Sequence, residues 1–249
     1  MTPLLLLPGL VCDRAVWAPL LPVLDGIADC RIADYGELAS IPAMAERVLA
    51  SAPPRFALAG HSMGGRVALE IMRLAADRVE RLALLDSGFQ ARPGGAPGDA
   101  ERAQRHALVD LARRKGMHSM GLEWLKGMLH PARLADHVLV DSIANMVARH
   151  PVAVFAAQIE ALLARPDAVD VLRAVKCPTL IGCGRQDHWS PLSRHVEMAA
   201  LVHGARLVVI EDSGHMAPME RPEQVAAALA AWIKQGADVV APTQIRKQT

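Results

Sequence analysis

Short aliphatic runs recur along this chain, each bounded by glycine, proline or polar residues. Apolar residues dominate these runs instead of alternating with polar ones, which is typical of strands covered on both faces in a parallel sheet. Between most of the runs lie stretches with apolar residues at helical spacing. This alternation predicts an α/β fold with a doubly wound, mostly parallel sheet of about six strands. The expected strands are Pro3–Leu7, Cys30–Asp34, Phe56–Ala59, Leu82–Leu85, Thr179–Cys183 and Arg206–Ile210.

The alternation stops once, in the middle of the chain. Residues 88–173 open with a loop rich in glycine and proline and then show helical patterns without a clear strand, at about 99–115, 119–128, 132–148 and 151–164. We therefore expect a helical insertion, residues 88–173, in a core formed by residues 1–87 and 174–235. A final amphipathic helix is expected over Pro222–Lys234, and the polar residues 236–249 are expected to form a flexible tail.

The charge and hydropathy of the chain favour a small-molecule partner. Lys and Arg total 27 against 26 Asp and Glu, so the formal charge of +1 creates no field that would attract nucleic acid or an anionic membrane. No apolar stretch approaches the ~20 residues of a membrane span, and Met1–Leu10 lacks the basic start of a secretory signal. We expect a soluble cytoplasmic protein without a membrane span; its oligomeric state is not indicated.

Metal and cofactor sites are not indicated either. The four cysteines, Cys12, Cys30, Cys177 and Cys183, lack the paired spacing of a zinc site and are too few for a disulfide framework in 249 residues. The histidines form no H-E-x-x-H or comparable pattern. We expect reduced thiols, no cofactor and no bound metal.

The run Gly60-His61-Ser62-Met63-Gly64 carries the clearest chemical signal. It lies between an aliphatic run that ends at Ala59 and a helical pattern that continues through Val67. A serine in a G-x-S-x-G turn between a strand and a helix is lifted above the edge of the sheet, where a substrate can reach its hydroxyl. Ser62 is therefore the predicted nucleophile.

A serine nucleophile needs a general base, and the base needs a carboxylate that fixes its tautomer. Asp187 follows the fifth expected strand and His215 follows the sixth. Together with Ser62 they lie at the carboxyl ends of strands, which is the edge where open α/β sheets bind ligands. We predict a triad of these three residues. Asp86, which also ends a strand, is the main rival for the acid.

These features together resemble the α/β-hydrolase family. The resemblance rests on the serine turn, on the Gly-x-x-Asp-x-x-x-Pro pattern of Gly184–Pro191, on Asp212-Ser213-Gly214-His215 and on Leu7-Pro8-Gly9-Leu10. It implies that the insertion is a cap over an active site. It also implies that backbone N–H groups of Leu10 and Met63 form an oxyanion hole. Many members have His-Gly where this chain has Pro8-Gly9. Many also have a hairpin before the strand that corresponds to Pro3–Leu7, so we expect a sheet with a shortened N-terminus.

The expected pocket is less closely defined than the triad. Its expected substrate-binding residues are Leu10, Met63, Trp124, Trp189 and Met216. His61 and His188 flank the triad positions and are expected to have structural or lining roles. The first helix of the insertion is basic, with Arg102, Arg105, Arg113, Arg114 and Lys115. Such a helix is usually a solvated face, and attraction of an anionic substrate is the alternative.

The predicted function is that of a serine hydrolase, a carboxylesterase or lactonase, acting on a small ester-like acyl substrate through an acyl-enzyme at Ser62. An acyl thioesterase or a cofactor-free perhydrolase could use the same triad, because the fold does not decide among these reactions. An alternative from another class is a ligand-sensing or partner-binding protein with slow turnover. No motif fixes the shape of the pocket, so the substrate stays open.

Overall fold

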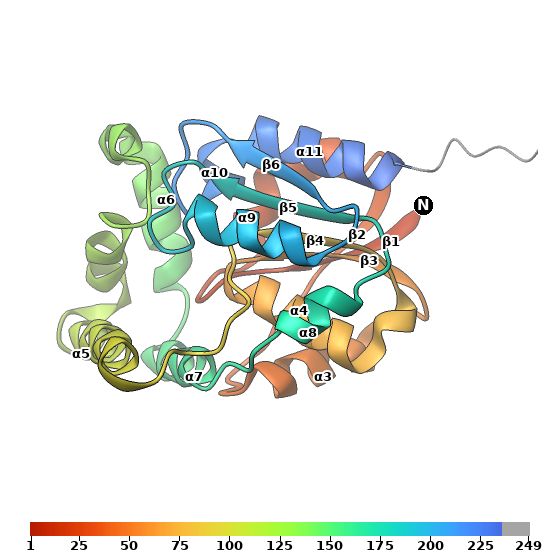
Figure 1. Cartoon of the computed structure of the whole chain (residues 1–249). Coiled ribbons are helices and arrows are strands. Elements are labelled where there is room, and N and C mark those ends of the chain that lie inside the picture. Colours follow the sequence, from red (N-terminus) through yellow and green to blue (C-terminus); the bar gives the residue numbers. More distant parts are fainter. Residues whose placement is uncertain (236–249) are drawn as a thin grey trace, which may run out of the picture.

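The computed structural model describes residues 1–235, and its centre is a six-stranded parallel sheet (Figure 1). The strands lie in the order β2-β1-β3-β4-β5-β6. They are β1 (Thr2–Leu7), β2 (Ala28–Ile32), β3 (Phe56–His61), β4 (Val79–Leu85), β5 (Thr179–Gly184) and β6 (Arg206–Ile210). The predicted α/β fold with a doubly wound sheet is confirmed. The tail predicted for residues 236–249 lies outside the described residues.

β1 begins one residue earlier than its aliphatic run predicts, and β2 and β4 begin two and three residues earlier. β2 is an edge strand that pairs only with β1, so most of its residues are only partly buried and its aliphatic signal is weak. Its first pair, Ala28 with Thr2, places its start before Cys30. β4 begins at Val79 because its first residues pair with the start of β3, although Glu80 and Arg81 are polar.

Two layers of helices cover the sheet. One layer contains α3 (Ile41–Ser51), α4 (Met63–Ala75), α8 (Val169–Ala174) and α9 (Leu192–Leu201). The other contains α1 (Arg14–Trp17), the turn η1 (Ala18–Leu20), α2 (Leu21–Leu24), α10 (Ala217–Glu220) and α11 (Pro222–Lys234). The bounds predicted for the last helix match those of α11. Helices on both faces explain why the central strands read as continuous apolar runs.

The segment between β4 and β5 is helical, as its sequence pattern predicts. It contains α5 (Gly95–Leu125), the turn η3 (Pro131–Ala135), α6 (His137–Ala148), α7 (Val152–Leu163) and then α8. α5 spans two of the expected helices and is broken between them at Gly116, whose φ is 82°. α5 packs against α6 and α7, whereas α8 packs against α4 and α9. Figure 1 shows α5, α6 and α7 gathered beyond the end of the sheet toward which the strands point.

One aliphatic core connects the sheet with this segment. Leu6 and Leu58 in the sheet and Ile143 and Phe155 in the helices belong to the same buried cluster. Each such side chain contributes roughly 1.5–3 kcal/mol by leaving water, so the helices are anchored to the sheet by burial. Within residues 1–235 no single helix is long and apolar enough to cross a membrane; α6 and α7 reach that length only as a pair bent by 92°.

Candidate active site

The order of the strands creates a crevice at the carboxyl end of the sheet. From β1 the chain goes outward to β2 and then returns to β3 on the other side of β1. The loops after β1 and β3 therefore leave the sheet in opposite directions at neighbouring points, where Leu7 pairs with Gly60. Such a switch point is where open α/β sheets bind ligands. It brings the loop of Leu10 next to Ser62.

Ser62 occupies a strained turn between β3 and α4. Its φ of 54° and ψ of −116° lie in a region that residues with a side chain rarely adopt. The turn requires glycine on both sides, because a Cβ at Gly60 would collide with the backbone of Gly64, and a Cβ at Gly64 would collide with the backbone of Leu7. The close packing of this turn holds the Ser62 hydroxyl above the edge of the sheet.

Two short hydrogen bonds connect Ser62, His215 and Asp187. The Ser62 Oγ lies 2.8 Å from His215 Nε2, and His215 Nδ1 lies 2.8 Å from Asp187 Oδ2. A carboxylate only accepts hydrogen bonds, so Nδ1 carries the proton and the neutral ring leaves Nε2 as the acceptor for the serine hydroxyl. The structure therefore brings the three predicted triad residues together in an arrangement that can draw the proton from Ser62.

Asp187 is held as an anion despite its burial. The residue is 3% exposed, and Oδ1 accepts the backbone N–H groups of Trp189 and Ser190, each at 2.8 Å. Burial alone would raise the pKa of this carboxyl, but the charge and hydrogen bond of His215, with the N–H of Ser190, outweigh it and leave the pKa below its ordinary value. Asp187 can thus orient the imidazole and stabilise its cation.

Asp86, the rival acid, lies behind the triad and does not reach His215 Nδ1. Its Oδ1 accepts the N–H of Gly184 at 2.8 Å, and its side chain is fully buried. Burial, and then the negative charge of Asp187, raise its pKa well above the ordinary value.

His61 lies beside Asp86 and donates Nε2–H to the carbonyl of His215 at 2.8 Å. Burial and the charge of His215 lower the pKa of His61 to about 3, so it supports the loop as a neutral ring.

Glu220 and the helical segment fix the loop that carries His215. Glu220 is almost fully buried, and its carboxylate accepts the N–H groups of Gly214, Met216 and His130. The N–H of His215 itself donates to the carbonyl of Met128 at 2.7 Å. Met128 and His130 belong to the segment between β4 and β5, so that segment helps to position the histidine.

Two backbone N–H groups beside Ser62 belong to Leu10 and Met63, two residues that line the cavity at this site. Neither the N–H of Met63, the first of α4, nor that of Leu10 donates a hydrogen bond within residues 1–235. The next residue, Val11, has a φ of 46°, which is unusual for a β-branched side chain. Its N–H donates to Oε1 of buried Gln158, on α7, at 2.8 Å. These two free N–H groups are the ones that the sequence predicts as oxyanion donors.

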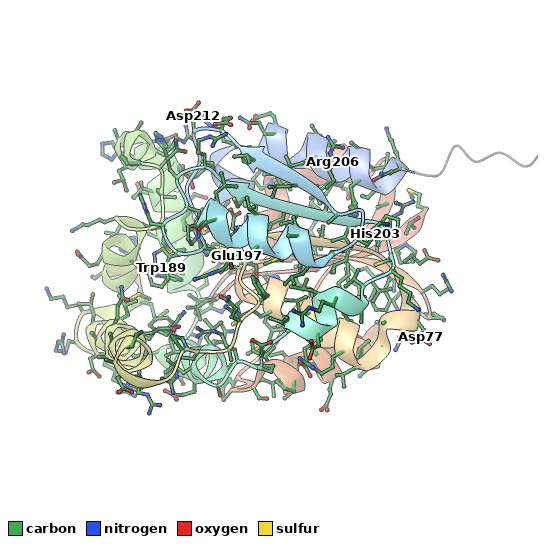
Figure 2. All side chains as sticks on the ribbon, in the orientation of Figure 1. Asp77, Trp189, Glu197, His203, Arg206 and Asp212 are labelled. Atoms are coloured by element: carbon green, nitrogen blue, oxygen red, sulfur yellow. The ribbon has the colours of Figure 1, made fainter. Side chains whose placement is uncertain are left out.

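A cavity of about 450 Å³ opens on Ser62 and His215. It is lined from the sheet side and from the helical segment, and it includes the predicted Leu10, Met63, Trp124 and Trp189 as well as His188. The two indoles meet edge to face at 6.1 Å, and Figure 2 shows Trp189 between the end of the sheet and the helices of that segment. Met216 is not among the lining residues; its side chain is buried in the aliphatic core.

Several residues of the site escaped the sequence analysis. Arg66, Arg165 and Arg194 line the cavity with Glu101, and Gln158 holds the loop after β1. Arg66 could have been found, since it lies four residues after Ser62 and so shares its helical face. Gln158 is a lone buried amide in the apolar stretch of α7, which is a weaker signal. Within the described chain, no group of three side chains could hold a metal ion.

Comparison with known proteins agrees with this geometry. Residues 3–228 match the family model described as the alpha/beta hydrolase family. The chain belongs to this family. The hydrolase is similar to a thermophilic esterase from Thermogutta terrifontis, solved with malate bound, at 29% identity and a TM-score of 0.82 over 94% of this chain and 90% of that one.

Two further relatives show the range of the family. The enol-lactonase from Burkholderia xenovorans LB400 shares the fold at 23% identity and a TM-score of 0.80, over 94% of this chain and 92% of that one. A Rhizobium rhizogenes protein with the provisional name carbamate hydrolase RutD is 26% identical over 246 residues, 89% of this chain and 88% of that protein. The protein is thus an enzyme of a hydrolase family that acts on ester-like bonds.

Proposed function

We propose that the protein is a carboxylesterase or lactonase that forms an acyl-enzyme at Ser62. The observation that carries this proposal is the chain of two 2.8 Å hydrogen bonds from Ser62 Oγ through His215 to Asp187. A serine, a neutral imidazole and a buried carboxylate in this order form the arrangement that activates a hydroxyl for attack on a carbonyl.

The reaction follows from the roles that these atoms can take. His215 Nε2 accepts the proton of Ser62 as Oγ attacks the carbonyl carbon, and Asp187 stabilises the imidazolium that forms. The N–H groups of Leu10 and Met63 donate to the oxyanion of the tetrahedral intermediate. His215 then gives its proton to the leaving alcohol, and a water molecule, activated by the same histidine, releases the acid.

The helical insertion acts as a cap in this proposal. Trp124 and Leu162 line the cavity from the insertion, opposite Ser62 on the core side. Apolar side chains such as these two exclude water from the acyl group and strengthen the hydrogen bonds to the oxyanion. The cap therefore helps to select the acyl group, while the core performs the transfer.

Substitution of the serine tests the proposal. Ser62→Ala is expected to lower kcat on short p-nitrophenyl esters by roughly 10⁴- to 10⁶-fold, with the melting temperature preserved. Ser193→Ala, an exposed serine on α9, is the matched control. A fluorophosphonate should add one adduct to the wild type, detected by intact mass, and none to Ser62→Ala. Near-normal turnover by Ser62→Ala would refute the acyl-enzyme.

The same assay separates the alternatives. Esters, lactones and acyl thioesters of graded chain length reveal whether an ester or a thioester is preferred. Repeated turnover supports an enzyme, whereas labelling of Ser62 without repeated turnover would favour a ligand-sensing protein.

A further inference from the structure

Four arginines converge on the cavity that contains Ser62. Arg66 and Arg194 come from the core, on α4 and α9, and Arg105 and Arg165 come from the insertion. Glu101 is the only carboxylate among the residues that line this cavity. The cavity thus has an excess of three positive charges, while the whole chain has a formal charge of only +1. The excess is local, and it lies where a substrate must bind.

Glu101 is already fully engaged by two of these arginines. Arg165 binds it with both terminal nitrogens, at 2.7 and 2.9 Å, and Arg105 Nε donates to it at 2.9 Å. Although burial opposes ionisation, the hydrogen bond from Arg165 and the charge of Arg105 lower the pKa of Glu101 to about 2. Arg105 also lies over the ring of Trp189, 5.8 Å from its centre. These contacts leave no carboxylate for Arg66 and Arg194.

Arg66 and Arg194 lack an anionic partner throughout residues 1–235. Each donates only to a backbone carbonyl, Arg66 to Gln90 at 2.9 Å and Arg194 to Trp189 at 3.3 Å. Both side chains pass over Gly88, where an added Cβ would lie 2.5 Å from Arg66 Nη2 and 3.4 Å from Arg194 Cδ. The two guanidinium groups therefore border the same part of the cavity and have free N–H donors.

The arrangement brings like charges close together. Burial, followed by the positive charges of Arg165 and Arg194, lowers the pKa of Arg66 well below its ordinary value. A guanidinium in a protein nevertheless stays protonated. An anion bound between Arg66 and Arg194 would reduce the repulsion between these positive charges.

We propose that Arg66 and Arg194 bind a carboxylate on the substrate, so that the acyl group attacked by Ser62 comes from a dicarboxylic acid. The proposal rests on the proposed function and specifies its substrate class: half-esters of dicarboxylic acids, or lactones that bear a carboxylate. The planar fork of a guanidinium matches the two oxygens of a carboxylate. Arg66 lies one helical turn after Ser62, so the anion binds beside the reacting carbonyl.

A matched pair of substrates tests the substrate class. The p-nitrophenyl half-ester of adipic acid and p-nitrophenyl hexanoate have the same acyl length and differ by a carboxylate in place of a methyl group. We expect kcat/KM to be at least about tenfold higher for the half-ester. Arg194→Gln and Arg66→Gln should each lower this ratio by about 10- to 100-fold, as expected for loss of a charge-assisted hydrogen bond.

Arg102→Gln is the matched control, because Arg102 lies next to Glu101 on α5 but is exposed and does not line the cavity. It removes the same charge from the region and should leave the ratio unchanged. If the wild type does not prefer the half-ester, or if Arg102→Gln lowers the ratio as much as Arg194→Gln, the carboxylate site is refuted.

Binding to Ser62→Ala separates this proposal from the proposed function. Adipate should bind the variant in calorimetry, adipamide should bind much more weakly, and adding Arg194→Gln should weaken adipate binding by about tenfold or more. If neither ester is hydrolysed but adipate binds in this way, the acyl-transfer proposal fails and the carboxylate site stands. If hexanoate is hydrolysed but adipate does not bind, the carboxylate site fails and the hydrolase stands.

Discussion

Ser62, Asp187 and His215 stand on loops that leave the parallel sheet, whereas Glu101, Arg105 and Trp124 reach the same cavity from the helices of the insertion. The sheet side is fixed by the backbone, through a strained serine and short hydrogen bonds to loop N–H groups. The insertion side consists mainly of long side chains. On the proposed function, this difference assigns the bond-breaking chemistry to the core, while selectivity depends on long side chains from both regions, since Arg66 and Arg194 of the core line the cavity as well.

The division between the two regions is not complete. Gln158 of the insertion binds the N–H of Val11, beside the expected oxyanion donor Leu10, and the carbonyl of Met128 binds the N–H of His215. The insertion therefore also supports the geometry of the catalytic loops. Variants on each side of the boundary can measure how far this support extends.

The largest effect is expected within the core, where two buried carboxyl groups can be compared. Asp187→Asn should lower kcat by roughly 10⁴-fold, because the amide cannot hold the imidazole in the required tautomer or stabilise its cation. Asp86→Asn should cost less than about tenfold, since an amide oxygen can still accept the N–H of Gly184 and the raised pKa already favours a neutral group here.

Steady-state kinetics on one ester, with thermal melting to check folding, measures both variants. Equal losses for Asp86→Asn and Asp187→Asn would mean that the acid is shared, and the single chain of hydrogen bonds through Asp187 would then be an incomplete description of the site.

An intermediate effect is expected where the insertion supports the core. Gln158→Leu leaves the buried N–H of Val11 without a partner and frees a strained residue to relax. The N–H of Leu10 then shifts, and kcat should fall by about 10- to 100-fold, less than the loss of an oxyanion donor itself. KM should change little, because the donor acts mainly in the transition state.

Gln158→Glu is the control, because it keeps an oxygen acceptor at this position and should retain more of kcat than the leucine variant. A change confined to KM would instead assign Gln158 to substrate binding, and the insertion would then contribute only to selectivity.

The difference between the sheet and the insertion also explains which parts of the structure could be predicted from the sequence. The strands could be predicted because burial on both faces leaves continuous apolar runs, and Ser62, Asp187 and His215 followed because each stands just after such a run. Edge strand β2 was misplaced by two residues because it is buried less completely. For these three residues, a position just after a strand in the sequence is also a position at the carboxyl end of the sheet.

The contacts made by side chains of the insertion follow no comparable local pattern. Arg165 lies 64 residues from Glu101, and Gln158 lies 147 residues from Val11, so these pairs depend on how helices pack and not on any local motif. Met216 was expected to bind substrate, but Glu220 anchors its backbone, its side chain is buried in the core and it is not among the residues that line the cavity. The position of Met216 next to His215 in the sequence therefore did not predict whether Met216 lines the cavity.

The smallest effect concerns stability and compares a histidine of the core with one of the insertion. His195 is fully buried and accepts the N–H of Ser87, and burial lowers its pKa from 6.5 to about 4. Between these two values the unfolded chain binds a proton that the folded chain excludes, so the free energy of unfolding falls as the pH drops below about 6.5. By about pH 5 this loss is on the order of 2 kcal/mol. Asp86 acts in the opposite sense, since its raised pKa weakens the fold as the pH rises, so only differences from the wild type are informative.

His195→Gln keeps an acceptor for Ser87 but cannot be protonated, so the loss of stability between about pH 8 and pH 5 should shrink by on the order of 2 kcal/mol. His150→Gln in the insertion should shrink it less: burial lowers the pKa of His150 too, but that ring is only partly buried and water still solvates its cation. Urea unfolding of both variants and the wild type at the two pH values measures these differences. An unchanged pH dependence in His195→Gln would show that the folded core accepts the proton, and a larger change in His150→Gln would reverse the contrast between a rigidly buried core and a more solvated insertion.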